Sequence, residues 1–350
     1  MPGGVFHYQD KIVSDDVERY LMSYDLRVAC LESAIGDSLE YDPEKMNGKM
    51  NIIYCKDNDF RRILELNINV VTLANNHVFD LGVEGFKNTR RLLEKYNIKY
   101  CGAGLNIKEA SEPAVINIGG KTIAFIAFCQ YGTPFIGYVP IATEENYGIN
   151  PLDINKVEEQ IFEAKKKFDF VIILPHWGRE YQIYPNKLEK RLAYRMIKAG
   201  ADAIIGGHTH RVQPAVLYRK RPIFYSLGNF AFPDFFMAPP RPMYYPESEK
   251  ELNDAKISYD YPNIVDSITK RVWLESSRYG MMASVKIENK KLKPSYQLSY
   301  LTEGLNVIEF AKHTMQILLM LKIIGIISKT WSYNDGKVLS KFVKIIRRNV

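Results

Sequence analysis

The sequence has few of the features that would place it in several common protein classes. It has four cysteines in 350 residues and no Cys-x-x-Cys pair, which argues against a zinc-thiolate site or a disulfide framework. No run of about 18 uncharged apolar residues is present, so no membrane-spanning helix is expected. Neither a Gly-x-Gly-x-x-Gly nor a Walker spacing occurs, and the glycine turn at 101–104 is interpreted as structural. Buried, reduced thiols are expected at Cys30, Cys55, Cys101 and Cys129.

Most of the chain also has no net charge of either sign. Residues 311–350 contain eight Lys or Arg and one Asp, a net charge of +7 that equals the net charge of the whole chain. Residues 1–310 are therefore neutral overall, which argues against a nucleic-acid groove across them and against nucleic acid as a partner. The sequence predicts two regions, a main domain over 1–310 and a basic amphipathic helical tail over 311–350. The tail either contacts an anionic membrane or another protein, or packs its apolar face on its own domain.

The main domain alternates helix-like and strand-like segments, which is the rhythm of an α/β protein. Helices are expected at 58–67, 84–96, 106–110, 153–167 and 187–199. Strands are expected at 26–31, 70–74, 122–128, 170–174 and 203–206, with further strands after residue 222. Residues 230–262 are crowded with prolines and aromatics, so no regular helix or central strand is expected there. This segment is either a lid or groove for an extended substrate, or an ordered loop that covers part of the core.

Histidine is scarce, yet four of the six histidines directly follow short apolar runs: His77, His176, His208 and His210. A further run, 26–31, ends at Glu32. Ligands in open α/β sheets bind beyond the carboxyl ends of strands, so these side chains can converge on one crevice. Alone, the His-x-His pair is more often an ordinary surface or strand feature. Glu32 alone fits a salt-bridged surface carboxylate as well as it fits a ligand. The repeated pattern of strand followed by polar ligand favours a metal site.

A series of motifs runs in order along residues 25–235. It comprises Cys30-Leu31-Glu32-Ser33, Leu73-Ala74-Asn75-Asn76-His77 with Asp80 and Gly82, Gly102-Ala103-Gly104, His176-Trp177-Gly178-Arg179-Glu180-Tyr181, Gly207-His208-Thr209-His210 and Tyr225-Ser226-Leu227-Gly228-Asn229-Phe230. The series resembles the bacterial capsule-synthesis CapA, or poly-γ-glutamate biosynthesis, proteins, which are metallophosphatase-like. The resemblance does not cover the tail beyond about residue 310.

The resemblance implies a four-layer α/β/β/α sandwich whose strand ends hold two divalent metal ions, either manganese, iron or zinc. The implied ligands are Glu32, Asn76, His176, His208 and His210. His77 would be the general acid or a group that stabilises the attacked anion, and Asp80 would orient the His77 ring. Arg179 and Arg211 could bind an anionic substrate, although exposed arginines near a pocket often have no such role.

The leading hypothesis is a metal-dependent hydrolase-like protein of capsule or poly-γ-glutamate biosynthesis that acts on, or helps to export, an anionic polymer. The alternatives are a non-catalytic assembly or export factor, working with a membrane-bound synthase complex, and a phosphoesterase for small phosphoester substrates. Fold resemblance does not decide between them. The family normally opens with a strand that ends in Gly-Asp, just before a segment like Met1–Gly4. In the family this Asp is a metal ligand. Either the sequence starts at an internal methionine, which we expect, or the protein has lost this strand and ligand. The localisation is therefore either cytoplasmic or membrane-associated.

Overall fold

The computed structural model describes residues 1–37, 49–133, 136–259, 264–288, 291–304, 306–312 and 317. Apart from residues 311, 312 and 317, the tail predicted over 311–350 lies outside this part of the chain, so its contact with an anionic membrane stays a prediction. Within the described ranges, no helix has the length and apolar character that a membrane crossing requires.

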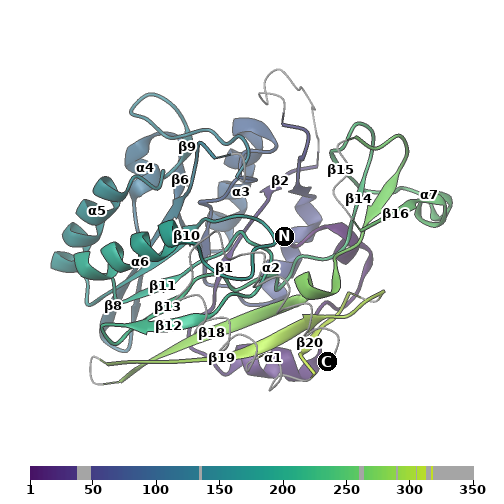
Figure 1. Ribbon diagram of the computed structural model, residues 1–350. Helices are drawn as coiled ribbons and strands as arrows, with labels where there is room; N and C mark the ends of the chain where they lie inside the picture. The colour runs from purple at the N-terminus through teal and green to yellow at the C-terminus, as the bar shows by residue number, and fades with distance from the viewer. Residues whose placement is uncertain are drawn as a thin grey trace.

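A six-stranded sheet forms the centre of the fold (Figure 1). The strands stand in the order β12-β13-β11-β10-β8-β7, parallel from β13 to β8 and antiparallel at the two edges. Strand β10 is buried at every position, which explains its continuous apolar sequence. The bounds are β7 Ala114–Ile118, β8 Lys121–Cys129, β10 Phe170–His176, β11 Ala203–Ile205, β12 Ala215–Tyr218 and β13 Arg221–Phe224.

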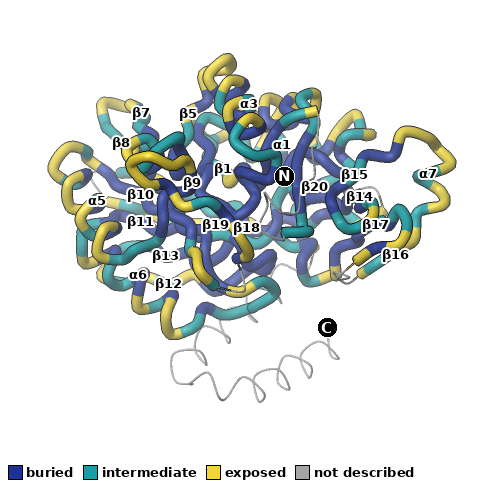
Figure 2. The backbone as a smooth tube through the Cα atoms, turned by 90° about the horizontal axis from the view of Figure 1, so that it is seen from above, coloured by how far each residue is buried: buried dark blue, intermediate teal, exposed yellow. Residues whose placement is uncertain are grey.

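The two faces of this sheet pack into different cores because side chains alternate along each strand. On β8, Ala124 and Ile126 pack with the helices of one face, whereas Ile123 and Phe125 belong to the main core on the other. Figure 2 shows the central strands buried, while the helices α5 and α6 are exposed along their outer sides. The helices of this face are α5 Ile154–Lys167 and α6 Lys187–Ala199.

A second parallel sheet, in the order β1-β4-β5, contributes to the main core. Val70 and Val71 of β4 lie in this core together with Phe86 and Leu93 of helix α3. The layers are α5 and α6, the six-stranded sheet, the three-stranded sheet, and α2 and α3, so the expected four-layer α/β/β/α sandwich is confirmed. The bounds are β1 Val28–Cys30, β4 Val70–Thr72, β5 Lys99–Cys101, α2 Arg61–Glu65 and α3 Gly82–Lys95.

A long hairpin, β18 and β19, runs along the lower edge of the molecule in Figure 1 and continues the fold beyond the sandwich. Strand β20 pairs with β19, and Met281 and Leu298 of the hairpin pack on Phe224 of the central sheet. The bounds are β18 Tyr279–Glu288, β19 Lys291–Leu301 and β20 Ile308–Phe310.

The smaller elements are the 3₁₀ helices η1 Gly4–Tyr8, η2 Asp57–Phe60 and η3 Glu275–Ser277, the helices α1 Asp15–Met22 and α4 Ile107–Ser111, and the strands β2 Ala34–Ile35, β3 Tyr54–Cys55, β6 Ala103–Gly104 and β9 Gly148–Ile149.

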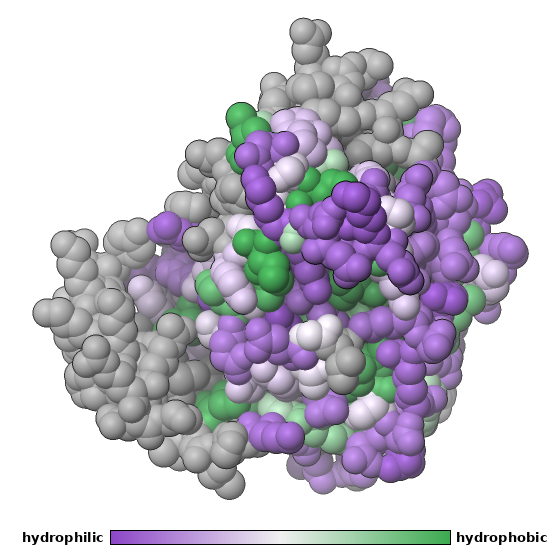
Figure 3. Space-filling view, turned by 90° about the vertical axis from the view of Figure 1, so that its right-hand side faces the viewer, coloured by the Kyte–Doolittle hydropathy of each residue, from purple (hydrophilic) through white to green (hydrophobic). Residues whose placement is uncertain are grey.

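The proline-rich segment 230–262 corrects one expectation, because it contains a central strand and a helix. Strand β14 is an inner strand of the four-stranded sheet β15-β14-β17-β16. Pro233 and Pro239 flank β14 without interrupting it, so its ladder hydrogen bonds form. Phe235 and Tyr245 are buried in the main core, which favours the ordered cover over the lid. Figure 3 shows that the surface on this side is mostly hydrophilic with small apolar clusters. The bounds are β14 Phe235–Met237, β15 Met243–Tyr244, α7 Glu249–Asp254, β16 Lys256–Ser258 and β17 Thr269–Arg271.

Asp234 forms hydrogen bonds and an ion pair that connect this segment to distant parts of the chain. Its carboxylate accepts hydrogen bonds from the Trp273 backbone, at 3.0 Å, and from the Arg278 guanidinium, at 3.1 Å. The Asn306 amide donates to the same carboxylate at 3.2 Å. Its backbone carbonyl accepts from the Val5 N–H at 3.0 Å. Because Asp234 and Arg278 are both almost fully buried, loss of either partner would leave an uncompensated charge inside the protein.

Candidate metal centre

The carboxyl ends of four strands deliver the side chains that the sequence singled out. Glu32 follows β1 and Asn76 follows β4. His176 is the last residue of β10, and His208 and His210 follow β11. Because β1 runs parallel to β4, and β10 parallel to β11, these ends lie at one edge of the sandwich, where ligands of α/β proteins are usually bound.

His176 Nε2 lies at the middle of the group. It is 2.9 Å from Asn76 Oδ1 and 3.1 Å from His208 Nδ1. Glu32 Oε1 lies 3.6 Å from the same nitrogen and 3.9 Å from His210 Nε2. All five side chains predicted as ligands therefore meet at one point, from segments up to 178 positions apart (210 minus 32).

His176 and His210 of this group are electrically neutral at pH 7. Burial lowers the pKa of His176 well below its usual value, and its neighbours His208 and His210 lower that pKa further. Burial likewise lowers the pKa of His210 to about 3, again with a contribution from His208. A neutral imidazole keeps a nitrogen lone pair, which is the form that binds a metal ion.

The surroundings of Glu32 test whether a metal ion would fit at this site. The residue is 8% exposed to solvent, and its Oε1 has no hydrogen-bond partner in the described part of the chain. Burial raises the pKa of Glu32 to about 8, against the opposing charge of the amino terminus. An unpaired buried polar atom costs roughly 1–3 kcal/mol, and a cation beside Oε1 would remove that cost. These nitrogen and oxygen donors therefore fit a divalent ion such as manganese, iron or zinc.

The backbone around the two histidines is strained. His208 has a φ of 92° and His210 a φ of 51°, in the left-handed region that residues with a Cβ seldom adopt. Each such residue costs on the order of 1–3 kcal/mol, and such strain concentrates at functional sites. The preceding Gly206 is required for a different reason, because a Cβ there would lie 2.2 Å from the Tyr225 carbonyl oxygen.

His77 lies beside the group and is held by Asp80. The His77 Nδ1 and the Asp80 Oδ2 are 2.6 Å apart, and the second carboxylate oxygen of Asp80 forms an ion pair with Lys49 at 2.5 Å. Burial lowers the pKa of His77 more than Asp80 raises it. Burial alone would raise the pKa of Asp80, but Lys49 and His77 outweigh it and lower that pKa. The carboxylate is therefore ionised, and it fixes a proton on His77 Nδ1.

Two supporting residues were missed by the sequence reasoning. Lys49 also donates to the Asn76 carbonyl, so it ties a predicted ligand to Asp80. The Asn229 Oδ1 lies 2.9 Å from His210 Nδ1 and orients that ring. Asn229 stands inside one of the ordered motifs, which is a signal that could have identified it. Nothing in the sequence around Lys49 distinguishes it from other lysines.

A family model described as bacterial capsule synthesis protein PGA_cap matches residues 5–234. The chain belongs to this capsule synthesis family. It is 38% identical over 169 residues to the "PGA biosynthesis protein CapA" of Bacillus subtilis (strain 168), covering 48% of this chain and 43% of that protein. It is 36% identical over 181 residues to the "Capsule biosynthesis protein CapA" of Bacillus anthracis, covering 51% and 43%. The chain thus spans less than half the length of these two relatives, and the predicted family resemblance is confirmed.

Among solved structures, this PGA_cap family member is similar to a 5′-nucleotidase precursor from Thermus thermophilus. The two share 15% sequence identity with a TM-score of 0.37, over 81% of this chain and 45% of that chain.

The structure places the two predicted substrate arginines of the PGA_cap protein differently. Arg179 is exposed at the surface. Arg211 is buried next to His210, donates a hydrogen bond to Ser276 and lies over the Tyr181 ring, 5.5 Å from its centroid. Binding of an anionic substrate by either arginine stays a prediction.

The four cysteines are not all buried, which corrects another expectation. Cys55, Cys101 and Cys129 are buried free thiols, but Cys30 is reached by solvent at the end of β1. Its Sγ, a carboxylate oxygen of Glu32 and a ring nitrogen of His176 lie within 4.8 Å of one another. Desolvation by the surrounding protein raises the pKa of this thiol well above its usual value, and the negative charge of Glu32 makes a smaller contribution in the same direction. Sequence reasoning grouped Cys30 with the core cysteines and so missed its place beside the candidate metal centre.

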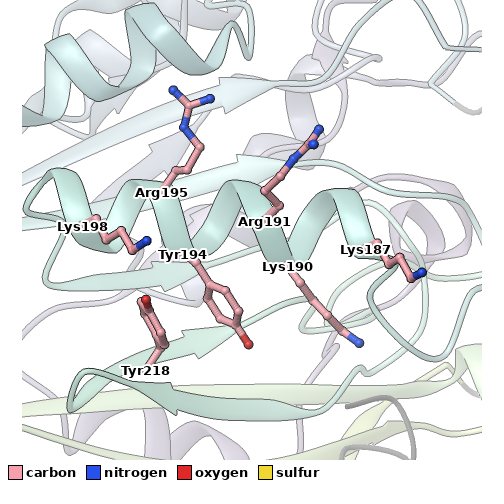
Figure 4. A pocket seen from close by; sticks show the side chains of 7 residues that line it. All are labelled: Lys187, Lys190, Arg191, Tyr194, Arg195, Lys198 and Tyr218. Carbon is pink, nitrogen blue, oxygen red and sulfur yellow. The ribbon is translucent and has the colours of Figure 1, made fainter. Parts of the chain in front are cut away.

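The PGA_cap protein also has a basic groove on helix α6, with a volume of about 340 Å³. Figure 4 shows cationic side chains along the helix and Tyr194 beside Tyr218, whose rings are stacked with centroids 4.2 Å apart. Arg195 is paired with Glu158 at 2.7 Å, whereas no partner in the described part of the chain holds Lys187, Arg191 or Lys198. The lining residues are Lys187, Lys190, Arg191, Tyr194, Arg195, Lys198 and Tyr218.

Proposed function

We propose that this family member is a metal-dependent hydrolase-like protein of capsule or poly-γ-glutamate production that acts on an anionic polymer through a dinuclear metal centre. The single observation that carries the proposal is the meeting of Glu32, Asn76, His176, His208 and His210 at the ends of four strands. The buried Glu32 Oε1 supports it, because that atom has no hydrogen-bond partner among the residues that the structure describes, and a cation would supply one. Residues so far apart in the sequence have no evident structural reason to converge there.

The chemistry divides between the ions and the side chains. Two bound ions would supply a hydroxide and stabilise the entering and leaving oxygens of a hydrolytic step. His77 lies beside the ligands with a proton fixed on Nδ1 by Asp80, and that contact sets the orientation of the ring. Its other nitrogen, Nε2, is then the atom available to exchange a proton with the leaving group or to face the attacked anion. Lys49 keeps Asp80 ionised, so the orientation persists at neutral pH.

The groove on α6 supports an anionic polymer as the partner. Residues 1–310 carry equal numbers of acidic and basic residues, yet five cations line this one helix face. The loop that leads into α6 is attached to the metal-centre segment, since the Tyr181 N–H donates to the Thr209 carbonyl at 2.7 Å. A carboxylate-rich chain bound along α6 would therefore approach the ligand histidines from the start of that helix.

The proposed function is tested with metal-free protein reloaded with manganese, iron or zinc. We expect the loaded protein to shorten poly-γ-glutamate, measured by gel filtration, and a chelator to stop the reaction until metal is restored. Full metal loading with retention of the polymer but no shortening would favour a non-catalytic assembly or export factor. Cleavage of small phosphoesters alone would favour a phosphoesterase. Absence of bound metal under all conditions would contradict the proposal.

Reversal of charge in the groove is expected to weaken polymer binding. In a variant with Lys187→Glu, Arg191→Glu and Lys198→Glu, three contacts of about 0.5 kcal/mol each are lost, so affinity for poly-γ-glutamate falls at least on the order of tenfold at low salt. Fluorescence anisotropy with a labelled polymer measures this loss. The salt dependence of binding should also become shallower, because fewer counterions are released.

A matched control reverses three exposed lysines outside the groove, at Lys99, Lys108 and Lys291. This control changes the total charge by the same amount, so it separates the groove from the net charge of the domain. Equal loss of affinity in both variants would contradict a binding role for the groove.

A further inference from the structure

Cys30 lies where a ligand to the metal centre would stand. The Cys30 Sγ, a Glu32 carboxylate oxygen and a His176 ring nitrogen are all within 4.8 Å of one another. Two ligand atoms that are each about 2.0–2.3 Å from one ion are separated by at most about 4.6 Å. A small side-chain adjustment would therefore bring all three atoms onto a single ion.

The position of Cys30 on its strand explains this geometry. Residues i and i+2 of an extended segment point to the same side, so Cys30 and Glu32 face the same space beyond β1. The Glu32 Oε1 is buried and has no hydrogen-bond partner among the described residues. The Glu32 carboxylate beside the Cys30 thiol therefore has an oxygen that a metal ion could bind. The two observations are independent, because one concerns the sulfur position and the other an unsatisfied oxygen.

Two of the other cysteines make contacts that account for their thiols. The Cys55 thiol donates to the Ser33 hydroxyl at 3.2 Å, and the Cys129 thiol donates to the Gln130 carbonyl at 3.2 Å. In the described part of the chain, no hydrogen bond to the Cys30 thiol is found. Cys30 is also the one cysteine of the four that solvent reaches. It therefore combines access for an incoming ion with a free sulfur.

We propose that Cys30 is a thiolate ligand of the metal centre, together with Glu32 and His176, and that it biases the site toward zinc over manganese. This inference rests on the proposed function, because it requires that the site bind a divalent ion. Thiolate is a soft ligand that favours zinc, whereas manganese favours oxygen ligands. On binding, a sulfur–metal bond forms and the sulfur–hydrogen bond breaks, with the proton released to solvent, because a coordinating thiol is deprotonated outright.

The test uses cobalt(II) as a spectroscopic replacement for zinc in the full chain. We expect the cobalt protein to show a near-ultraviolet thiolate-to-cobalt charge-transfer band. The Cys30→Ser variant should lose that band but still bind cobalt through its histidines. In competition between zinc and manganese, the same variant should take up relatively less zinc. Cys55→Ala is the matched control, since it removes a thiol outside the site and should keep the band.

The outcomes separate the inference from the proposed function. Cobalt bound by the unmodified protein without a charge-transfer band would overturn the role of Cys30 and leave the proposed function standing. A band that persists in Cys30→Ser would assign the sulfur to another cysteine and would also overturn it. An unmodified chain that binds no cobalt, zinc or manganese would overturn both.

Discussion

Replacement of both His208 and His210 by alanine is expected to abolish uptake of divalent metal. His208 Nδ1 lies 3.1 Å from His176 Nε2, and His210 Nε2 lies 3.9 Å from Glu32 Oε1, so each ring is one side of the proposed centre. With both rings gone, two of five protein ligands are lost and the remaining donors no longer surround an ion. Metal analysis after dialysis against zinc or manganese should find less than about a tenth of the unmodified content, on the order of the affinity losses seen when metal sites are disrupted.

A control for this experiment is His7→Ala. His7 contacts Asp59 at 2.7 Å and belongs to a different part of the core, so its removal should leave the metal content unchanged. Circular dichroism of each metal-free variant checks that the fold is intact. Metal content that stays unchanged in the double variant would contradict the assignment of these two histidines.

Replacement of His77 by glutamine is expected to lower the rate of hydrolysis by about 10²–10⁴-fold, the usual contribution of a positioned proton donor or acceptor. The metal content should stay the same, because His77 is not among the predicted ligands. Glutamine retains polarity at this buried position but cannot transfer a proton as imidazole does. The measurement is kcat on the shortest anionic polymer that the unmodified protein cleaves, with metal content determined on the same sample.

Asp80→Asn separates orientation of the ring from proton transfer itself. The asparagine can donate to His77 Nδ1 and so reverse the tautomer, and we expect a loss of kcat of up to about 10⁴-fold, comparable to that of His77→Gln. A kcat within a few fold of the unmodified value in His77→Gln would refute the role of this residue. If metal is lost together with activity, His77 acts as a ligand and its assignment to proton transfer is wrong.

The α/β character of the fold and the position of the site could be predicted from local sequence patterns, whereas the four-layer sandwich was implied by the family resemblance. The run Phe170–Leu174 is apolar at every position, which is the mark of a strand covered on both faces, and His176 follows within two residues. The same logic placed Glu32 and His77 at strand ends, whereas Asn76 was identified through the family resemblance. The strand-end predictions need only the rule that parallel strands end at the same edge.

The remaining features depend on tertiary contacts that leave no local signal. Lys49 contacts Asp80, which lies 31 positions later in the sequence, and no pattern of hydrophobic residues predicts that pairing. Cys30 ends an apolar run just as a core cysteine would, and its exposure is decided by what lies beside β1. The strand Phe235–Met237 was missed because the prolines around it were taken to break the whole segment, although none falls inside the strand. In each case the deciding contact comes from another part of the chain.

The contacts of Asp234 have a consequence for biosynthesis. This residue joins Val5, near the start of the chain, to Trp273, Arg278 and Asn306, and it lies shortly after the segment that orients His210 through Asn229. A ribosome must therefore release more than 300 residues before the buried charge of Asp234 finds all its partners. Until then, the partly synthesised chain exposes apolar surface that the finished fold buries, which favours aggregation of such intermediates. Completion of the contacts around Asp234 is thus among the last events of synthesis, not one of the first.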